Sequence, residues 1–241
     1  MYGPEGPSLR ELAVQALSSV EHGYDLLAPK FDHTPFRTPA SVLDSVAGVL
    51  GRLGPFDDGL DLCCGTGAGT DVLARVCRAS VTGVDFSAGM LDVARRHPRP
   101  PAPRIAWVRG DARALPFAPA FDLAVSFGAF GHFLPRELPG LFAQVHSVLR
   151  PGGSFAFPVA APPHPTHPGF WMLRGFDAVM RVRNAVRRPP FVMYYRTLRF
   201  SLLRDELERA GFEVRQYALP DFGRRDDGSP RARLIVGRRL P

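Results

Sequence analysis

The chain of 241 residues is poor in cysteine and contains no long apolar run. Its three cysteines, Cys63, Cys64 and Cys77, are odd in number and lie in one short stretch, which argues against a disulfide framework and against the paired spacing of a zinc site. No segment approaches the roughly 18 consecutive apolar residues that span a bilayer. The first residues lack the basic and then apolar layout of a signal peptide. We therefore expect a cytoplasmic protein that holds no metal and has no membrane span.

Lysine is almost absent, because Lys30 is the single lysine among 30 basic residues. Together with 25 prolines and a single asparagine, Asn184, this preference for arginine indicates a genome-wide compositional bias. The net charge of +7 is therefore weak evidence for a nucleic-acid partner, and we do not expect one.

The pattern of apolar residues predicts one α/β domain. From about residue 58, short apolar runs alternate with segments of helical period, which is typical of a parallel sheet covered by helices on both faces. The turn-rich stretch 226–230 favours a hairpin, so the last strand should run antiparallel. The expected strands are Gly59 to Cys63, Ala79 to Asp85, Arg104 to Arg109, Phe121 to Phe127, Gly153 to Val159, Phe212 to Ala218 and Arg231 to Gly237. Helices are expected at roughly 69–78, 88–96, 136–149 and 200–210.

Two segments fall outside this alternation, and we expect both to lie over the carboxyl ends of the strands. The first should contain helices near Leu9 to Glu21 and Pro39 to Leu53. The second begins with a proline-dense stretch and continues, from residue 170 to 188, with apolar residues at helical spacing and arginines on the other side. The expected single domain, 1–241, thus divides into an N-terminal helical cap at 1–54, a cofactor-binding core at 55–160, a lid at 161–200, and a C-terminal helix and hairpin at 201–241.

A glycine-rich loop follows the first expected strand. Glycine allows the backbone to turn sharply and to approach a ligand closely. Gly65, Gly67 and Gly69 have a closer spacing than the G-x-G-x-x-G loop of dinucleotide enzymes, which needs a glycine where Thr70 stands. Asp61 lies four residues before Gly65, and its carboxylate suits a ligand with an ammonium group and would repel a pyrophosphate.

Two further acids follow later strands. Asp85 ends the second expected strand, where a carboxylate can accept hydrogen bonds from both hydroxyls of a ribose. Asp111 follows the third strand and can accept a hydrogen bond from an adenine amino group, while the N–H of Ala112 faces a ring nitrogen. The three positions together indicate a nucleoside-containing cofactor with a charged amine.

These motifs, with Leu149-Arg150-Pro151-Gly152-Gly153 before the fifth strand, resemble the class I S-adenosylmethionine-dependent methyltransferases. The resemblance covers about residues 40 to 160 and is greatest to the branch that contains quinone-biosynthesis and small-molecule methyltransferases. It implies a Rossmann-like three-layer sandwich with seven mostly parallel strands, S-adenosylmethionine as cofactor, and direct methyl transfer. The resemblance implies cofactor contacts by the loop from Gly65 to Gly69 and by Asp85, Asp111 and Ala112. With the residues expected from their positions alone, the expected cofactor-binding residues are Asp61, Gly65, Thr66, Gly67, Gly69, Asp85, Phe86, Asp111, Ala112 and Phe127.

The methyl acceptor should bind near the end of the fourth strand. His132 is the candidate general base, because it lies at the carboxyl end of that strand and titrates in a useful range; packing of the loop is the alternative role. The remaining pocket candidates are mostly aromatic, which favours a small aromatic or apolar metabolite. Seven arginines between residues 161 and 200 also allow an anionic one. The other expected pocket residues are Tyr24, Phe130, Phe133, Trp171, Tyr194 and Tyr195.

Two other functions remain open from the residues alone. A nicotinamide-dependent oxidoreductase also has a glycine-rich loop, although Thr70 and Asp61 count against it. A non-catalytic module could bind the cofactor and contact RNA or protein through its arginine-rich cap. The chain is compatible with either a monomer or a homodimer.

Overall fold

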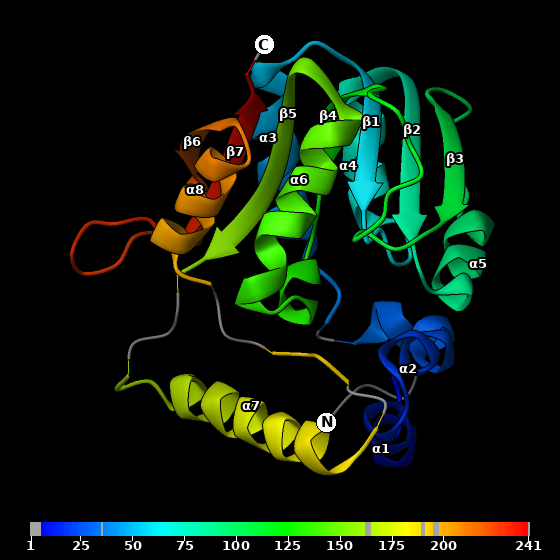
Figure 1. Ribbon diagram of the computed structural model, residues 1–241, viewed down its shortest axis with the longest axis vertical. Helices are drawn as coiled ribbons and strands as arrows, with labels where there is room; N and C mark the ends of the chain where they lie inside the picture. Colours follow the sequence, from blue (N-terminus) through cyan, green and yellow to red (C-terminus); the bar gives the residue numbers. More distant parts are fainter. Residues whose placement is uncertain (1–5, 35, 162–164, 189–190, 195–197, 241) are drawn as a thin grey trace.

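Seven strands form one sheet in the order β3-β2-β1-β4-β5-β7-β6 (Figure 1). The computed structural model describes residues 6–34, 36–161, 165–188, 191–194 and 198–240. The strands are β1 (Phe56–Leu62), β2 (Cys77–Asp85), β3 (Arg104–Arg109), β4 (Phe121–Val125), β5 (Leu149–Ala160), β6 (Phe212–Ala218) and β7 (Ala232–Arg239). All seven overlap an expected strand, and β3 and β6 have the expected bounds.

The direction of the strands confirms the predicted fold class. Strands β1 to β5 pair in parallel, with β1 between β2 and β4. Strand β7 pairs antiparallel with both β5 and β6. The connection between β6 and β7 contains the one-turn helix η4 (Pro220–Phe222) and the expected turn, and the antiparallel pairing of the two strands confirms the predicted hairpin.

Helices cover both faces of the sheet and complete three layers. Helices α3 (Ala40–Leu53) and α4 (Ala68–Val76) pack on one face, and α6 (Leu138–Val148) and α8 (Phe200–Arg209) on the other. Helix α5 (Ala88–Arg96) follows β2 and contacts β3. Strand β5 is apolar on both sides: Phe155 and Phe157 join one core and Ala156 the other, because successive side chains of a strand point to opposite faces.

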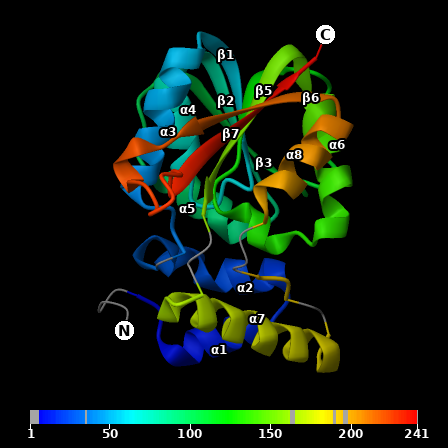
Figure 2. The same ribbon diagram turned by 90° about the vertical axis from the view of Figure 1, so that its left-hand side faces the viewer.

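The remaining helices lie at the carboxyl ends of the parallel strands (Figures 1 and 2). They are α1 (Leu9–Leu17), α2 (Val20–Leu27), the 3₁₀ helix η1 (Ala28–His33) and α7 (Pro168–Val186). The expected single helix from Leu9 to Glu21 is in fact divided, because the Ser19 hydroxyl accepts a hydrogen bond from His22 N–H and starts a new helix. Helix α3 departs from the expected position over the strand ends, since its buried side chains belong to the core on the sheet face.

Helix α7 forms as expected, but most of the apolar residues that define its period point outward. Met172, Val179, Val182 and Val186 are exposed, whereas Asp177 and Met180 are buried on the opposite side. None of the helices in the described ranges combines the length and the apolar character that a transmembrane helix needs.

The larger core predicts a clear cost for truncating Phe142. This residue is fully buried on α6, and its ring lies 6.2 Å from Phe155 and 6.4 Å from Phe157, measured between ring centroids. Replacing Phe142 with Ala removes these contacts and leaves a cavity, so the free energy of unfolding should fall by about 3–5 kcal/mol in urea titrations. Leu53→Ala, at the exposed end of α3, is the control and should change it by less than about 1 kcal/mol. A similar small effect for both variants would contradict the predicted core.

Candidate functional site

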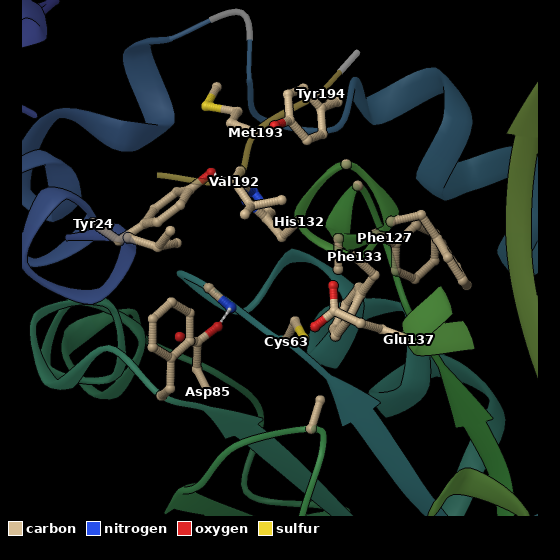
Figure 3. Close-up of a pocket in the computed structure, with 18 of the residues that line it drawn as sticks. Tyr24, Cys63, Asp85, Phe127, His132, Phe133, Glu137, Val192, Met193 and Tyr194 are labelled. Atoms are coloured by element: carbon tan, nitrogen blue, oxygen red, sulfur yellow. Dashed lines mark hydrogen bonds between the residues drawn. The ribbon is translucent and has the colours of Figure 1, made fainter. Parts of the chain in front are cut away.

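A cavity of about 790 Å³ lies at the carboxyl ends of the strands, beneath the helical cap. The loops after β1, β2 and β3 line one side (Figure 3). The opposite side is formed by α2, by the 3₁₀ helix η2 (Ala129–His132) after β4, and by residues 192–194, which follow α7. Its volume lies in the upper part of the range of roughly 300–1,000 Å³ that is usual for ligand sites.

The glycine loop turns sharply at the floor of this cavity. Cys63 and Gly65 both have positive φ values, 57° and 53°. A Cβ atom at Gly65 would meet no atom within 4 Å, so this position faces open space. Gly67 plays a different part, because a Cβ there would collide with Arg99 and Trp107. Only Gly65 of the three expected loop glycines lines the cavity.

Asp85 lies at the end of β2 and reaches the floor of the cavity. One of its oxygens accepts a hydrogen bond from Gly65 N–H and the other from Ser87 N–H, both at 2.9 Å. Burial raises the pKa of its carboxyl to about 6. At neutral pH the group is therefore mainly ionised, and each oxygen keeps a lone pair for a further donor.

Asp61 and Thr66 shape the loop from behind, outside the cavity lining. The Asp61 carboxylate is buried, accepts a hydrogen bond from the Thr70 hydroxyl at 2.9 Å, and has its pKa raised to about 7 by that burial. The Thr66 hydroxyl donates to Asp32 of η1 at 2.7 Å. A Cβ atom at Gly69 would lie 2.5 Å from an Asp61 oxygen, so only glycine fits above this acid.

The other expected cofactor residues come together at the cavity. Phe86, Asp111, Ala112 and Phe127 all line it. The Asp111 carboxylate accepts a hydrogen bond from Arg113 N–H at 2.9 Å and remains about half exposed, at 53%. These positions follow three different strands, and the parallel pairing brings them to one edge of the sheet.

The expected acceptor residues are only partly brought together. Tyr24, Phe130, Phe133 and Tyr194 line the cavity with His132. Trp171 does not reach it: its ring lies on the outer surface of α7, where the indole N–H donates to Pro165 O. Tyr195 lies outside the described residues.

His132 is held in one tautomer by two partners. Its Nδ1 lies 2.7 Å from the carbonyl oxygen of Val192, which can only accept, so Nδ1 carries the proton. Its Nε2 lies 2.8 Å from the Tyr24 hydroxyl, which therefore donates to it. Burial lowers the pKa of His132 and raises that of Tyr24. The imidazole is consequently neutral, and its Nε2 lone pair accepts from Tyr24, which also lines the cavity.

The cavity wall also contains residues that sequence reasoning missed, among them Cys63, Arg113, Glu137 and Val192. The Arg113 guanidinium bonds the Glu137 carboxylate at 2.9 Å and lies 4.8 Å from the centroid of the Phe133 ring. Arg113 directly follows Asp111 and Ala112, so its position in the sequence could have predicted its place in the cavity wall. No sequence pattern predicts the position of Glu137. In the described ranges, no group of three or more His, Cys, Asp or Glu side chains is arranged to hold a metal ion.

Comparison with known proteins identifies the domain. Residues 60–153 match the methyltransferase domain family. The 2-phytyl-1,4-naphtoquinone methyltransferase of Thermosynechococcus vestitus is 39% identical over 99 residues, which cover 40% of this chain and 43% of that protein. The chain carries a class I S-adenosylmethionine-dependent methyltransferase domain. Its cofactor is S-adenosylmethionine, which decides against the nicotinamide alternative.

A further relative and a solved structure extend over more of the chain. The demethylmenaquinone methyltransferase of Renibacterium salmoninarum is 34% identical over 172 residues, which cover 65% of this chain and 66% of that protein. The crystal structure of human N-acetylserotonin methyltransferase in complex with S-adenosylmethionine shares the fold, with a TM-score of 0.61 at 15% identity, over 98% of this chain and 60% of that one. The chain therefore spans less than two thirds of the length of these relatives.

Asp85→Ala should weaken binding of S-adenosylhomocysteine to this methyltransferase domain. The carboxylate lies on the cavity floor, and ligand hydroxyls left without an acceptor cost about 1–3 kcal/mol, or roughly 5- to 150-fold in affinity. Isothermal titration calorimetry measures the effect. Asp92→Ala is the matched control, because Asp92 is an exposed acid on α5 that pairs only with the surface residue Arg95. Equal affinities for the two variants would remove Asp85 from the cofactor site.

The raised pKa of Asp85 predicts a pH dependence of the same affinity. Ligand hydroxyls donate to the ionised carboxylate, so protons compete with the ligand once the pH falls through about 6. Affinity should be nearly constant between pH 8 and pH 7. As the pH is lowered further, the affinity should fall, and the decrease should approach roughly tenfold per pH unit below pH 6. Asp61 remains in the Asp85→Ala variant, where its pKa should be lower because the charge of Asp85 no longer raises it. An identical pH profile for the two proteins would show that Asp85 is not the titrating group.

Proposed function

We propose that the chain methylates a small hydroxylated aromatic molecule with apolar substituents, and that His132 is its general base. The observation that carries the proposal is the neutral imidazole in the cavity wall, with Nδ1–H held by Val192 and an unprotonated Nε2 that is hydrogen-bonded to the Tyr24 hydroxyl. S-adenosylmethionine, when bound, supplies an electrophilic methyl group on a sulfonium. The protein must then hold the acceptor in line and remove one proton.

The residues present fit the cofactor. Gly65 leaves open space above the loop, and the Asp85 carboxylate beside it offers free lone pairs to ribose hydroxyls. Phe86 and Ala112 would contact the adenine, and Asp111 would accept from its amino group. Asp61 would act through the shape and charge of the loop, since it lies behind Gly69 and does not reach the cavity.

The lining of the opposite wall supports the acceptor class. Phe130, Phe133 and Tyr194 contribute aromatic surface there, and Met193 and Val192 aliphatic surface. Two relatives are named for 2-phytyl-1,4-naphtoquinone and demethylmenaquinone, which agrees with an aromatic acceptor that carries apolar substituents. The described arginines of segment 161–200 that lie on α7 do not line the cavity. Two arginines from elsewhere, Arg113 and Arg136, do line it, and Arg113 is paired with Glu137. Arg136 is thus the cavity arginine that could hold an anionic substituent of the acceptor.

The chain's own groups account for the proton. The acceptor hydroxyl would compete with Tyr24 for the Nε2 lone pair of His132, which takes the proton as the methyl group is transferred. The Val192 carbonyl keeps the ring oriented and stabilises the proton on Nδ1 while Nε2 is charged. The acceptor gains one methyl group and loses one proton, so charge and atoms balance. Phe133, which is buried at this wall, limits the access of water.

His132→Ala tests the proposal. Methyl transfer from labelled S-adenosylmethionine to a panel of hydroquinones and phenols should fall by roughly 10²- to 10⁴-fold, while the affinity for S-adenosylhomocysteine stays unchanged. The wild-type rate should rise with pH through a value below 6.5 and then level off, because only the neutral imidazole accepts a proton. His22→Ala, an exposed histidine on α2, is the control. Unchanged turnover in His132→Ala would show that His132 is not the general base. If the wild type binds the cofactor but methylates no acceptor of the panel, the result would favour a non-catalytic module.

A further inference from the structure

The outer face of α7 carries an exposed apolar stripe. Trp171, Met172, Val179, Val182 and Val186 are between 63% and 81% exposed. At 3.6 residues per turn, these five side chains fall within a sector about 100° wide along the whole helix. Gly175, Ala178 and Ala185 lie in or beside the same sector and are also exposed, so no charged residue interrupts the stripe.

Arginines border the stripe, and no acid does. Arg174 and Arg181 follow one border at a spacing of two turns, and Arg187 and Arg188 follow the carboxyl end of the helix. Asp177 is the single acid of the helix, and it is fully buried on the opposite face. Within the described part of the chain, these four arginines form no ion pair with a carboxylate; Arg174 and Arg181 instead lie over the rings of Phe170 and Tyr194.

The inner face of α7 fixes this orientation. Met180 and Phe176 pack into a small cluster with Phe191 and Met193. Asn184 donates to Phe191 O at 3.0 Å and accepts from Phe191 N–H at 2.8 Å. The helix is therefore anchored from within, and the ribbon views show it at the outer end of the molecule, beyond the carboxyl ends of the strands (Figures 1 and 2).

We propose that the outer face of α7, defined by Trp171, Met172, Val179, Val182 and Val186 with Arg174 and Arg181 at its border, docks on an anionic lipid bilayer. An apolar stripe with a tryptophan enters the boundary between headgroups and acyl chains, while arginines at its border contact lipid phosphates. Unpaired cations and the lack of exposed acid on this face complement the negative surface of such a bilayer. This surface is separate from the catalytic cavity and goes beyond the proposed reaction.

The arrangement of charge favours a bilayer over other partners. A second copy of this face would bring Arg174 and Arg181 against their equivalents with no carboxylate to pair with them. A nucleic acid would need cations at the centre of the surface, where this helix places valines and a tryptophan. Both segments that join α7 to the core line the cavity, Val159 and Ala160 before it and residues 192–194 after it. A docked α7 would thus hold the cavity close to the bilayer.

Vesicle flotation tests the proposal on the full chain. The protein should float with vesicles of phosphatidylcholine that contain about 30 mol% phosphatidylglycerol, much less with phosphatidylcholine alone, and less as the salt concentration rises. Val179→Asp combined with Val182→Asp should reduce binding at least tenfold. Arg174→Gln combined with Arg181→Gln should reduce it on the anionic vesicles. Leu53→Asp combined with Leu240→Asp, two exposed residues outside α7, is the matched control and should bind like the wild type.

Tryptophan fluorescence gives a second measurement, which begins with the unsubstituted chain. The chain has two tryptophans, of which Trp107 is partly buried against Gly83 while Trp171 is exposed. Anionic vesicles should shift the emission to the blue, brominated acyl chains should quench it, and both effects should vanish in Trp171→Phe.

Several results would overturn the proposal. The first is that the wild type does not float with anionic vesicles, and the second is that the double aspartate variant floats equally well while its fold and its affinity for S-adenosylhomocysteine are intact. The third is a dimer in light scattering that this variant abolishes, and the fourth is salt-sensitive binding of RNA in place of vesicles. None of these measurements requires methyl transfer, so their outcome is independent of the proposed role of His132.

Discussion

The hydrogen bond from Gly65 N–H to the Asp85 carboxylate joins the ends of β1 and β2, and the geometry of the cavity depends on it. A second bond, from Cys64 N–H to Val84 O at 2.9 Å, continues the pairing of these parallel strands into the turn. The loop is thereby forced to bend at Cys63 and Gly65, where φ is positive, and exposes backbone toward the cavity. The cost is a buried carboxylate, which is reflected in its raised pKa.

The cap is fastened around that same bend by three acids. Asp25 accepts from the Ser87 hydroxyl at 2.6 Å and from Gly89 N–H at 2.9 Å, at the start of α5. Glu21 pairs with Arg109 at the end of β3, and Asp32 accepts from Thr66. Helix α2, which carries Glu21 and Asp25, also supplies Tyr24, so the contacts that close the cap over the strand ends bring the Tyr24 hydroxyl to His132.

Local pattern was enough to predict the sheet, since strand period, turn residues and glycine spacing are properties of neighbouring residues. The strands, the antiparallel β7, Asp85 and the Asp111 loop were all predictable in this way. The break between α1 and α2 was missed although Ser18 and Ser19 mark it, because the surrounding residues keep a helical period. Trp171 lies outside the cavity, and the apolar stripe of α7 points outward, because the opposite face of the helix packs on Phe191 and Met193. The helical period in the sequence identifies an apolar face but does not show which part of the protein covers it.

The two walls of the cavity are built from different parts of the chain, and the family match covers mainly one of them. The cofactor wall is built from strand ends whose register is set by the sheet, and residues 60–153 carry both that register and the family match. Much of the acceptor wall comes from α2 and residues 192–194, which lie outside the match and rest on a cluster with three buried residues, Met180, Phe191 and Met193. Such segments can change without disturbing the two large cores beneath them. Under the proposed function, Tyr24, Val192, Met193 and Tyr194 surround His132 and would determine which molecule receives the methyl group.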